Sequence, residues 1–206
     1  MIVKIIIFCL LSYLFSGIPF AFIVSKFFLK TDIRKVGSGN VGATNVYRIG
    51  GWKYGIPVFV LDFMKGFIPT LISVFYFDKN LEISTIVAIS TVLGHMFTPY
   101  LKFKGGKGAA TSFGSFIVLF PFEILVCAIF FLISVITTRI VAVGTIISAF
   151  FFPIVYFVMG KLLNITFPFK KFSNIDFLLI ILVVAFIILK HKSNIERLIK
   201  GNENRI

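Results

Sequence analysis

Charge is scarce in this 206-residue chain, and acidic charge is the scarcest. Charged residues make up 14% of the sequence, and it contains only 8 acidic side chains, 2 histidines and 2 cysteines. So few carboxylates, imidazoles and thiols form no grouped ligand set for a metal. Cys9 and Cys127 each lie inside an apolar run, where a thiol packs as a small hydrophobic group. The composition therefore does not support a metal enzyme or a disulfide scaffold, and we expect no cofactor.

Hydrophobic residues take the place of charge. They make up 58% of the chain, a share well above that of soluble domains. They fall in runs of about 17–25 residues, the length that crosses the hydrocarbon core of a bilayer. We therefore expect an all-α, polytopic integral membrane protein whose residues 1–206 form a single membrane-embedded domain. The predicted helices cover residues 5–28, 54–77, 83–101, 111–120, 122–137, 140–159 and 175–189.

The net charge of +13 is concentrated in three polar segments. These are the first loop (residues 30–52) with its flanking lysines, the second loop (residues 102–108) and the tail (residues 190–206). Because such charges alternate with apolar runs, they indicate anionic lipid or an anionic substrate and exclude nucleic acid as a partner. Basic segments stay inside, so all three are predicted to be cytoplasmic, with the N-terminus outside. The loop with Lys161, Lys170 and Lys171 fits this orientation poorly.

This orientation constrains the number of helices. Two apolar runs separate the first loop from the second, but three obvious runs separate the second loop from the tail and would place the tail outside. A break at Pro121 removes the conflict, because proline readily ends a helix. It splits the stretch into a short helix (111–120) and a second one (122–137), and short helices are tolerated beside a protein-lined cavity. About seven helices follow, although five or six stay possible.

The first loop contains a glycine-rich segment, residues 37–48. Its glycines permit positive φ and let backbone amides converge on an anion. Several side chains add hydrogen-bond donors, namely Ser38, Asn40, Thr44, Asn45 and Arg48. With no carboxylate, Cys or His among them, this set suits a phosphate better than a metal. Taken alone, the segment is equally well explained as a flexible turn between two helices.

The second loop has the sequence Lys-Phe-Lys-Gly-Gly-Lys-Gly and leads into a helix. It lacks the spacing of a nucleotide-binding P-loop, and no strand precedes it. Glycines, Lys107 and the exposed amides of a helix N-terminus nevertheless favour an anion. The alternative is a basic interfacial loop that binds anionic lipid.

The tail places His191, Asn194 and Arg197 at i, i+3 and i+6 of a predicted helix, on or near one face. Such a polar stripe at the mouth of a membrane span can face a cytoplasmic site. It can equally be the solvated end of a helix.

Ionisable residues also occur inside the apolar runs. Asp62 and Lys65 lie one helical turn apart, so mutual neutralisation explains them without catalysis. His95 is a functional candidate because it lies at membrane depth, but a histidine satisfied by packing is at least as good an explanation.

Taken together, the three motifs resemble the PlsY family of bacterial inner-membrane acyl-phosphate:glycerol-3-phosphate acyltransferases. They are Ser-Gly-Asn-Val-Gly-Ala-Thr-Asn (38–45), Gly-His-Met-Phe with Lys-Phe-Lys-Gly-Gly-Lys-Gly-Ala-Ala-Thr (94–111), and His-Lys-Ser-Asn-Ile-Glu-Arg-Leu-Ile-Lys-Gly-Asn-Glu (191–203). The resemblance covers nearly the whole chain. It implies a seven-helix membrane fold with a cytoplasmic site. It also implies the transfer of an acyl group from acyl phosphate to glycerol 3-phosphate, and hence a functional link to the enzyme that supplies acyl phosphate.

The resemblance also implies roles for residues. Catalysis is expected from Ser38, Arg48, Lys107, His191 and Asn194. Substrate binding is expected from Ser38, Gly39, Asn40, Thr44, Asn45, Arg48, Gly105, Gly106, Lys107, His191 and Asn194. With no evident Ser-His-Asp set and no H-x-x-x-x-D motif, we expect direct acyl transfer without an acyl-enzyme. The base is His191 or a substrate phosphate oxygen.

Two other classes of protein remain possible at this point. A transporter for a phosphorylated solute would also use glycine-rich loops and broken helices. The two halves of the chain show no repeat, however, and the polar loops lie at one end rather than at the midplane. A structural, lipid-organising protein would explain the basic loops but not the Ser, Asn and Thr donors between glycines.

Overall fold

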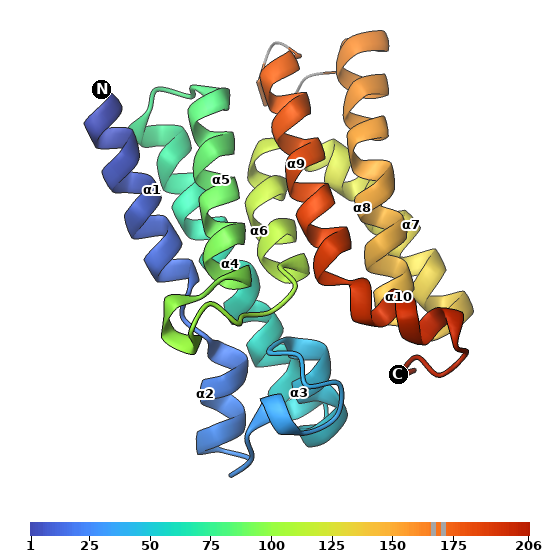
Figure 1. Cartoon of the computed structure of the whole chain (residues 1–206). Helices are drawn as coiled ribbons and strands as arrows, with labels where there is room; N and C mark the ends of the chain where they lie inside the picture. Colours follow the sequence, from blue (N-terminus) through green and yellow to red (C-terminus); the bar gives the residue numbers. More distant parts are fainter. Residues whose placement is uncertain (166–167, 170–171) are drawn as a thin grey trace.

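The structure, a computed structural model, describes residues 1–165, 168–169 and 172–206, so the expectation for Lys170 and Lys171 lies outside the described residues. All regular elements in the described part are helical, which confirms the all-α prediction (Figure 1). The α-helices are α1 (Ile2–Ser16), α2 (Phe20–Phe27), α3 (Ala43–Gly50), α4 (Trp52–Tyr76), α5 (Leu81–Met96), α6 (Ala109–Leu119), α7 (Pro121–Thr138), α8 (Val141–Phe157), α9 (Asn174–Lys190) and α10 (Lys192–Ile199). Short turns of other helix types cover Ile33–Lys35, Pro99–Leu101 and Val158–Leu162.

Five stretches of the described chain are long and apolar enough to cross a membrane. They are Ile2–Phe27, Trp52–Tyr76, Leu81–Leu101, Pro121–Thr138 and Val141–Leu162. The pair α9 and α10, bent by 54°, makes a sixth if it is counted as one span. With the short apolar α6, the described chain has seven apolar helices. This is the number that a shared side for the three basic segments required.

Two of the helix breaks fall at prolines. As predicted, the long stretch after the second loop divides at Pro121, where α6 ends at Leu119 and α7 begins. The first predicted helix (5–28) was wrong in one respect, because it is interrupted between α1 and α2 at Gly17–Pro19. The prediction of a loop over residues 30–52 was also wrong in part, because residues 43–50 form α3.

Glycines allow α4 and α6 to pack backbone against backbone. A Cβ on Gly66 would lie 2.2 Å from the Thr111 carbonyl oxygen, and one on Gly114 would lie 2.1 Å from the Phe63 carbonyl oxygen. The contact therefore requires glycine from both helices. Close packing of small residues is a main source of helix association in lipid, where the hydrophobic effect gives no help.

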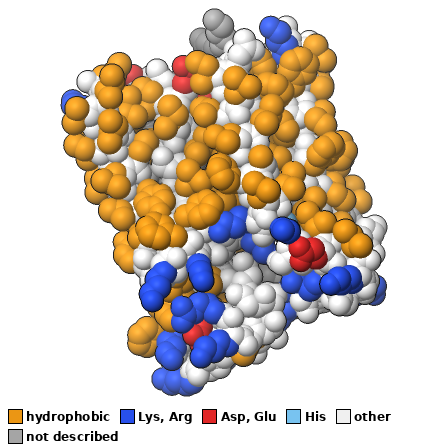
Figure 2. Space-filling view, viewed as in Figure 1, with side chains coloured by type: hydrophobic (Ala, Val, Ile, Leu, Met, Phe, Trp, Pro, Cys, Tyr) orange, Lys and Arg blue, Asp and Glu red, His pale blue; other side chains and the backbone are white. Residues whose placement is uncertain are grey.

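The three motif segments meet at one end of the bundle, opposite the N-terminus (Figure 1). α2 and α3 project beyond the helices there, and α10 turns across the same end. On the face shown in Figure 2, Lys and Arg side chains gather at this end, and hydrophobic side chains cover most of the rest. The helices thus present an apolar wall to lipid and a basic end to water.

Candidate active site

One amide side chain organises the first loop. Asn45, near the start of α3 and 1% exposed, accepts a hydrogen bond from the Ser38 backbone N–H at 3.0 Å. Its Nδ2 donates to the carbonyl oxygens of Ile33, Val36 and Asn40 at 3.1–3.2 Å. Asn45 therefore binds the loop backbone on all sides. It positions Ser38 and Asn40, whose side chains line the adjacent cavity.

The second loop packs on the end of α5. Gly105 N–H donates to the Met96 carbonyl at 3.2 Å, and Gly106 N–H donates to the His95 carbonyl at 3.2 Å. These amides are therefore already paired. Beyond them Gly108 takes a positive φ of 84° and starts α6. Ala109 and Ala110 in the first turn of α6 line the cavity, and the first amides of a helix have no partner within it.

The bend between α9 and α10 presents the third motif. His191 lies at this corner and is 3% exposed, with its Nδ1 2.7 Å from the Ile187 carbonyl oxygen. That contact makes Nδ1 the protonated nitrogen and leaves Nε2 with a lone pair. One turn later, Asn194 accepts a hydrogen bond from Lys107 Nζ, which joins the third motif to the second.

The tail supplies a carboxylate that sequence reasoning did not place in the site. Glu203 accepts from Asn194 Nδ2 at 3.0 Å and forms an ion pair with Arg197 Nε at 2.9 Å. The next residue, Asn204, accepts from Arg48 Nη2 at 3.0 Å through its carbonyl oxygen. The tail thereby links α10 to α3 of the first loop.

Positive charge exceeds negative charge in this cluster. Arg48, Lys107 and Arg197 interact electrostatically with one carboxylate, Glu203. Burial, with the neighbouring Arg197 guanidinium, lowers the pKa of Lys107 to about 8. Arg48 Nε and Arg197 Nη2 are buried and have no hydrogen-bond partner among the described residues. Unpaired buried N–H groups are costly, so the cluster is suited to accept an anion such as phosphate.

Arg48 and Lys107 of this cluster border one end of a cavity of about 500 Å³. The predicted site residues in its lining are Ser38, Asn40, Thr44, Asn45, Arg48, Lys107, His191 and Asn194, and further polar residues of the lining are Tyr47, Asp62, His95, Ser112, Thr145 and Ser148. Away from the cations the cavity is mostly apolar and continues between α6, α7, α8 and α9, with Phe113, Phe116, Ile124, Phe131, Phe152 and Val184 in its wall. A molecule with an anionic head and a hydrocarbon tail matches both parts.

Comparison with known proteins agrees with this geometry. Residues 6–201 match the family model described as "Glycerol-3-phosphate acyltransferase". The chain belongs to this family. A relative named glycerol-3-phosphate acyltransferase from Aquifex aeolicus is 41% identical over 94% of this chain and 95% of its own length. One from Endomicrobium trichonymphae is 36% identical over 100% of this chain and 97% of its own length.

Solved structures place the chain in the PlsY branch of the family. The crystal structure of PlsY in its glycerol 3-phosphate form has a TM-score of 0.88 at 37% identity, covering 98% of this chain and 96% of that one. The lysophosphatidic acid form has a TM-score of 0.85 at 35% identity. The chain is therefore an acyltransferase and a multi-pass membrane protein, and the transporter and structural alternatives are set aside.

Within this PlsY-type acyltransferase, most of the predicted site residues come together. The eight that line the cavity were all expected from the sequence. Gly39, Gly105 and Gly106 do not line it. The Gly39 amide donates to the Val36 carbonyl at 3.0 Å, so all three glycines shape loops rather than present amides to the cavity.

Two residues of the site were not among the predicted set. Arg197 was noticed only as part of the polar stripe, and Glu203 ends the third motif. The available signal for Glu203 was that it is one of only two acidic residues, with Glu196, in a basic tail.

Proposed function

We propose that this acyltransferase moves a fatty acyl group from acyl phosphate to the sn-1 hydroxyl of glycerol 3-phosphate, giving lysophosphatidic acid and inorganic phosphate. The proposal rests on one cavity that has Arg48 and Lys107 at one end, beside Arg197 and Glu203, and a mostly apolar wall elsewhere. The donor requires both environments in one molecule, and the acceptor adds a second phosphate. The glycerol 3-phosphate and lysophosphatidic acid forms of the PlsY neighbours support the acceptor and the product.

The reaction requires one bond to form and one to break. The glycerol hydroxyl oxygen attacks the carbonyl carbon of the donor, and the bond from that carbon to the phosphate oxygen then breaks. The phosphate departs with the electron pair. Lys107, Arg48 and the first amides of α6 are placed to stabilise negative charge on the leaving phosphate and the carbonyl oxygen.

We propose direct transfer, without an acyl-enzyme. The side-chain hydroxyl groups at the polar end belong to Ser38, Thr44 and Tyr47, and among the described residues no basic side chain is hydrogen-bonded to any of them. A serine needs such a partner to act as a nucleophile. The Cys127 thiol lies in the apolar part of the lining, away from any cation.

The proton of the attacking hydroxyl goes to His191 or to a phosphate oxygen. His191 is supported by its geometry, because its Nδ1 contacts the Ile187 carbonyl and its Nε2 is left to accept a proton beside the cavity. If His191 is the base, His191→Ala lowers kcat by about 100-fold or more. The exposed neighbour Lys192 gives the matched control Lys192→Ala.

We further propose that the polar end faces the cytoplasm across the bacterial inner membrane. The basic residues at that end support this orientation through the positive-inside rule. Acyl phosphate would come from a separate enzyme. Its chain would remain among the apolar helices while its head enters the cation cluster.

Purified enzyme in detergent or lipid tests the proposal. It is given glycerol 3-phosphate with either acyl phosphate or acyl-CoA, and lysophosphatidic acid and inorganic phosphate are measured. We expect equal amounts of both products from acyl phosphate. Absence of product refutes the reaction, and efficient use of acyl-CoA refutes the donor. The intact mass after incubation with acyl phosphate alone should be unchanged, and an acyl adduct would contradict direct transfer.

A further inference from the structure

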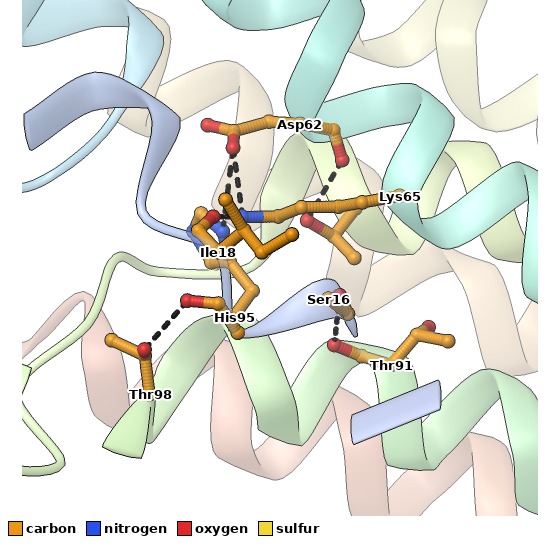
Figure 3. Close-up of polar contacts among 9 residues, drawn as sticks. Ser16, Ile18, Asp62, Lys65, Thr91, His95 and Thr98 are labelled. Carbon is orange, nitrogen blue, oxygen red and sulfur yellow. Dashed lines mark hydrogen bonds and ion pairs between the residues drawn. The ribbon is translucent and has the colours of Figure 1, made fainter. Parts of the chain in front are cut away.

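A second group of ionisable residues lies beside the cavity, inside the membrane domain. Asp62 and Lys65 on α4 form an ion pair with Oδ1 and Nζ 2.9 Å apart, and His95 Nδ1 on α5 lies 3.7 Å from the same carboxylate oxygen (Figure 3). The side chains are 1–8% exposed. We call these three residues the α4–α5 cluster. The acyl transfer proposed above does not use it.

Stability alone does not account for the cluster. Removing charges from water costs several kcal/mol, and hydrophobic replacements of a buried ion pair are often no less stable. Ionisable residues within membrane spans are rare for the same reason. The contacts that the cluster makes with other segments therefore call for an explanation.

Two of these contacts attach neighbouring segments to α4. Lys65 Nζ also donates to the Ile18 carbonyl oxygen at 3.0 Å, which fixes the break between α1 and α2 (Figure 3). Thr111 Oγ1, in the first turn of α6, donates to the Asp62 backbone carbonyl at 2.9 Å. The same helical turn of α4 thus holds the segment that leads to the first loop and the start of the helix after the second loop.

His95 makes the contact with the second loop. Its carbonyl accepts from Gly106 N–H, and a Cβ on Gly106 would lie 2.2 Å from His95 Nε2 and 2.5 Å from the Val41 carbonyl oxygen of the first loop. Gly106 is therefore held between the imidazole and the first loop. With Nδ1 facing Asp62 and Nε2 facing Gly106, neither nitrogen is available to a substrate, although His95 borders the cavity.

We propose that the α4–α5 cluster is a positioning device, which fixes the two glycine-rich loops relative to each other and so sets the spacing of the two bound phosphates. Asp62 orients Lys65 and His95, Lys65 holds the α1–α2 break, and His95 holds Gly106 against Val41. This inference rests on the proposed function, because only a site for two phosphates needs two loops at a fixed separation. Misplacement of reacting groups by about 1 Å can cost about 100-fold in rate.

The test compares His95→Ala and His95→Gln with wild type, measuring kcat and the KM for each substrate, together with the midpoint of thermal unfolding. His95→Ala should lower kcat by at least about 10-fold while each KM changes by less than about threefold, because each loop still binds its own phosphate. Glutamine fills similar space and can donate to Asp62, so His95→Gln should recover most of kcat. The double variant Asp62→Asn/Lys65→Met removes both charges, and should fold but show the same fall in kcat.

The matched control is Ser73→Ala on α4. Ser73 is also fully buried, but its Oγ donates to Thr70 within its own helix, so kcat should not change. Unchanged kcat in His95→Ala overturns the proposal, as does a rise in KM alone. A folded His95→Gln as inactive as His95→Ala also overturns it, since that result would require imidazole chemistry. If wild type forms no lysophosphatidic acid, the proposed function fails first, and the two failures are thus distinguishable.

Discussion

Replacement of Asn45 should disable the first loop through its backbone. Asn45→Ala removes four hydrogen bonds, one from the Ser38 amide and three to carbonyl oxygens. Because the two N–H groups of the amide are shared among three carbonyl oxygens, this amounts to about three full bonds, and at about 1 kcal/mol net for each the loss is about 3 kcal/mol. Asn45→Asp should be at least as harmful although it has the same shape, because a carboxylate only accepts and would face three carbonyl oxygens. Both variants should lose most activity, since Ser38 and Asn40 depend on the loop conformation.

Thermal unfolding in detergent and lysophosphatidic acid formation together provide the measurement. Lys35→Ala is the matched control, because this exposed side chain lies in the same loop outside the cavity. It should keep both the unfolding midpoint and the activity. An Asn45→Asp variant with wild-type stability and turnover would refute the reasoning, because it would mean that the side-chain amide does not donate to the loop carbonyls.

Three further predictions concern the charge, the apolar wall and the second loop. Since the pKa of Lys107 is about 8, this cation is lost as pH rises through 8. Hence kcat/KM for glycerol 3-phosphate should fall above pH 8, and Lys107→Arg should move this fall to higher pH. An unchanged pH profile in Lys107→Arg would show that another group causes the fall. Phe152→Ala should shift the preference of a graded acyl-phosphate series toward longer chains, by up to about fourfold in kcat/KM per added methylene at about 0.8 kcal/mol each. Phe150→Ala, at an exposed position of the same helix, should leave the profile unchanged, and a similar shift there would contradict this role. Gly106→Ala should abolish activity because its Cβ meets His95 and Val41. Gly51→Ala, with nothing within 4 Å of its Cβ, meets only backbone strain at φ 75° and ψ −174°, which costs about 1–3 kcal/mol of stability, and the folded variant should keep its activity. An active Gly106→Ala enzyme would show that the second loop can move freely.

The helix breaks show what the sequence could and could not predict. The break at Pro121 followed from the requirement that three basic segments share one side of the membrane. The break near Pro19 also has a proline, in Gly-Ile-Pro, but no charge count demanded a break there, and the apolar run continues through it. α3 was missed because its residues are polar and glycines flank them, as in a loop. The helical conformation of residues 43–50 is apparent only in the structure.

The candidate site divides in a similar way. Residue types predicted that cations and amides between glycines serve one site, and the structure brings eight of these residues to one cavity. They could not separate groups that contact a ligand from groups that hold the backbone. Asn45 and Gly106 belong to the second kind, because their partners lie in other segments of the chain. The Asp62–Lys65 pair was predicted from its helical spacing and is confirmed at 2.9 Å.

The short α6 has a consequence for how the chain enters the bilayer. Its 11 residues extend about 16 Å, roughly half of the ~30 Å hydrocarbon core. A helix of that length cannot insert as an independent span, and the turn that follows it needs cover from protein, as the burial of Phe120 reflects. Gly66 and Gly114 hold the body of α6 against α4, whereas the Phe120 ring packs on Phe152 and Tyr156 of α8, with centroids 6.1 and 5.0 Å apart. The short helix therefore depends on partners from both sides of it in the sequence, α4, which is synthesised before it, and α8, which is synthesised after it.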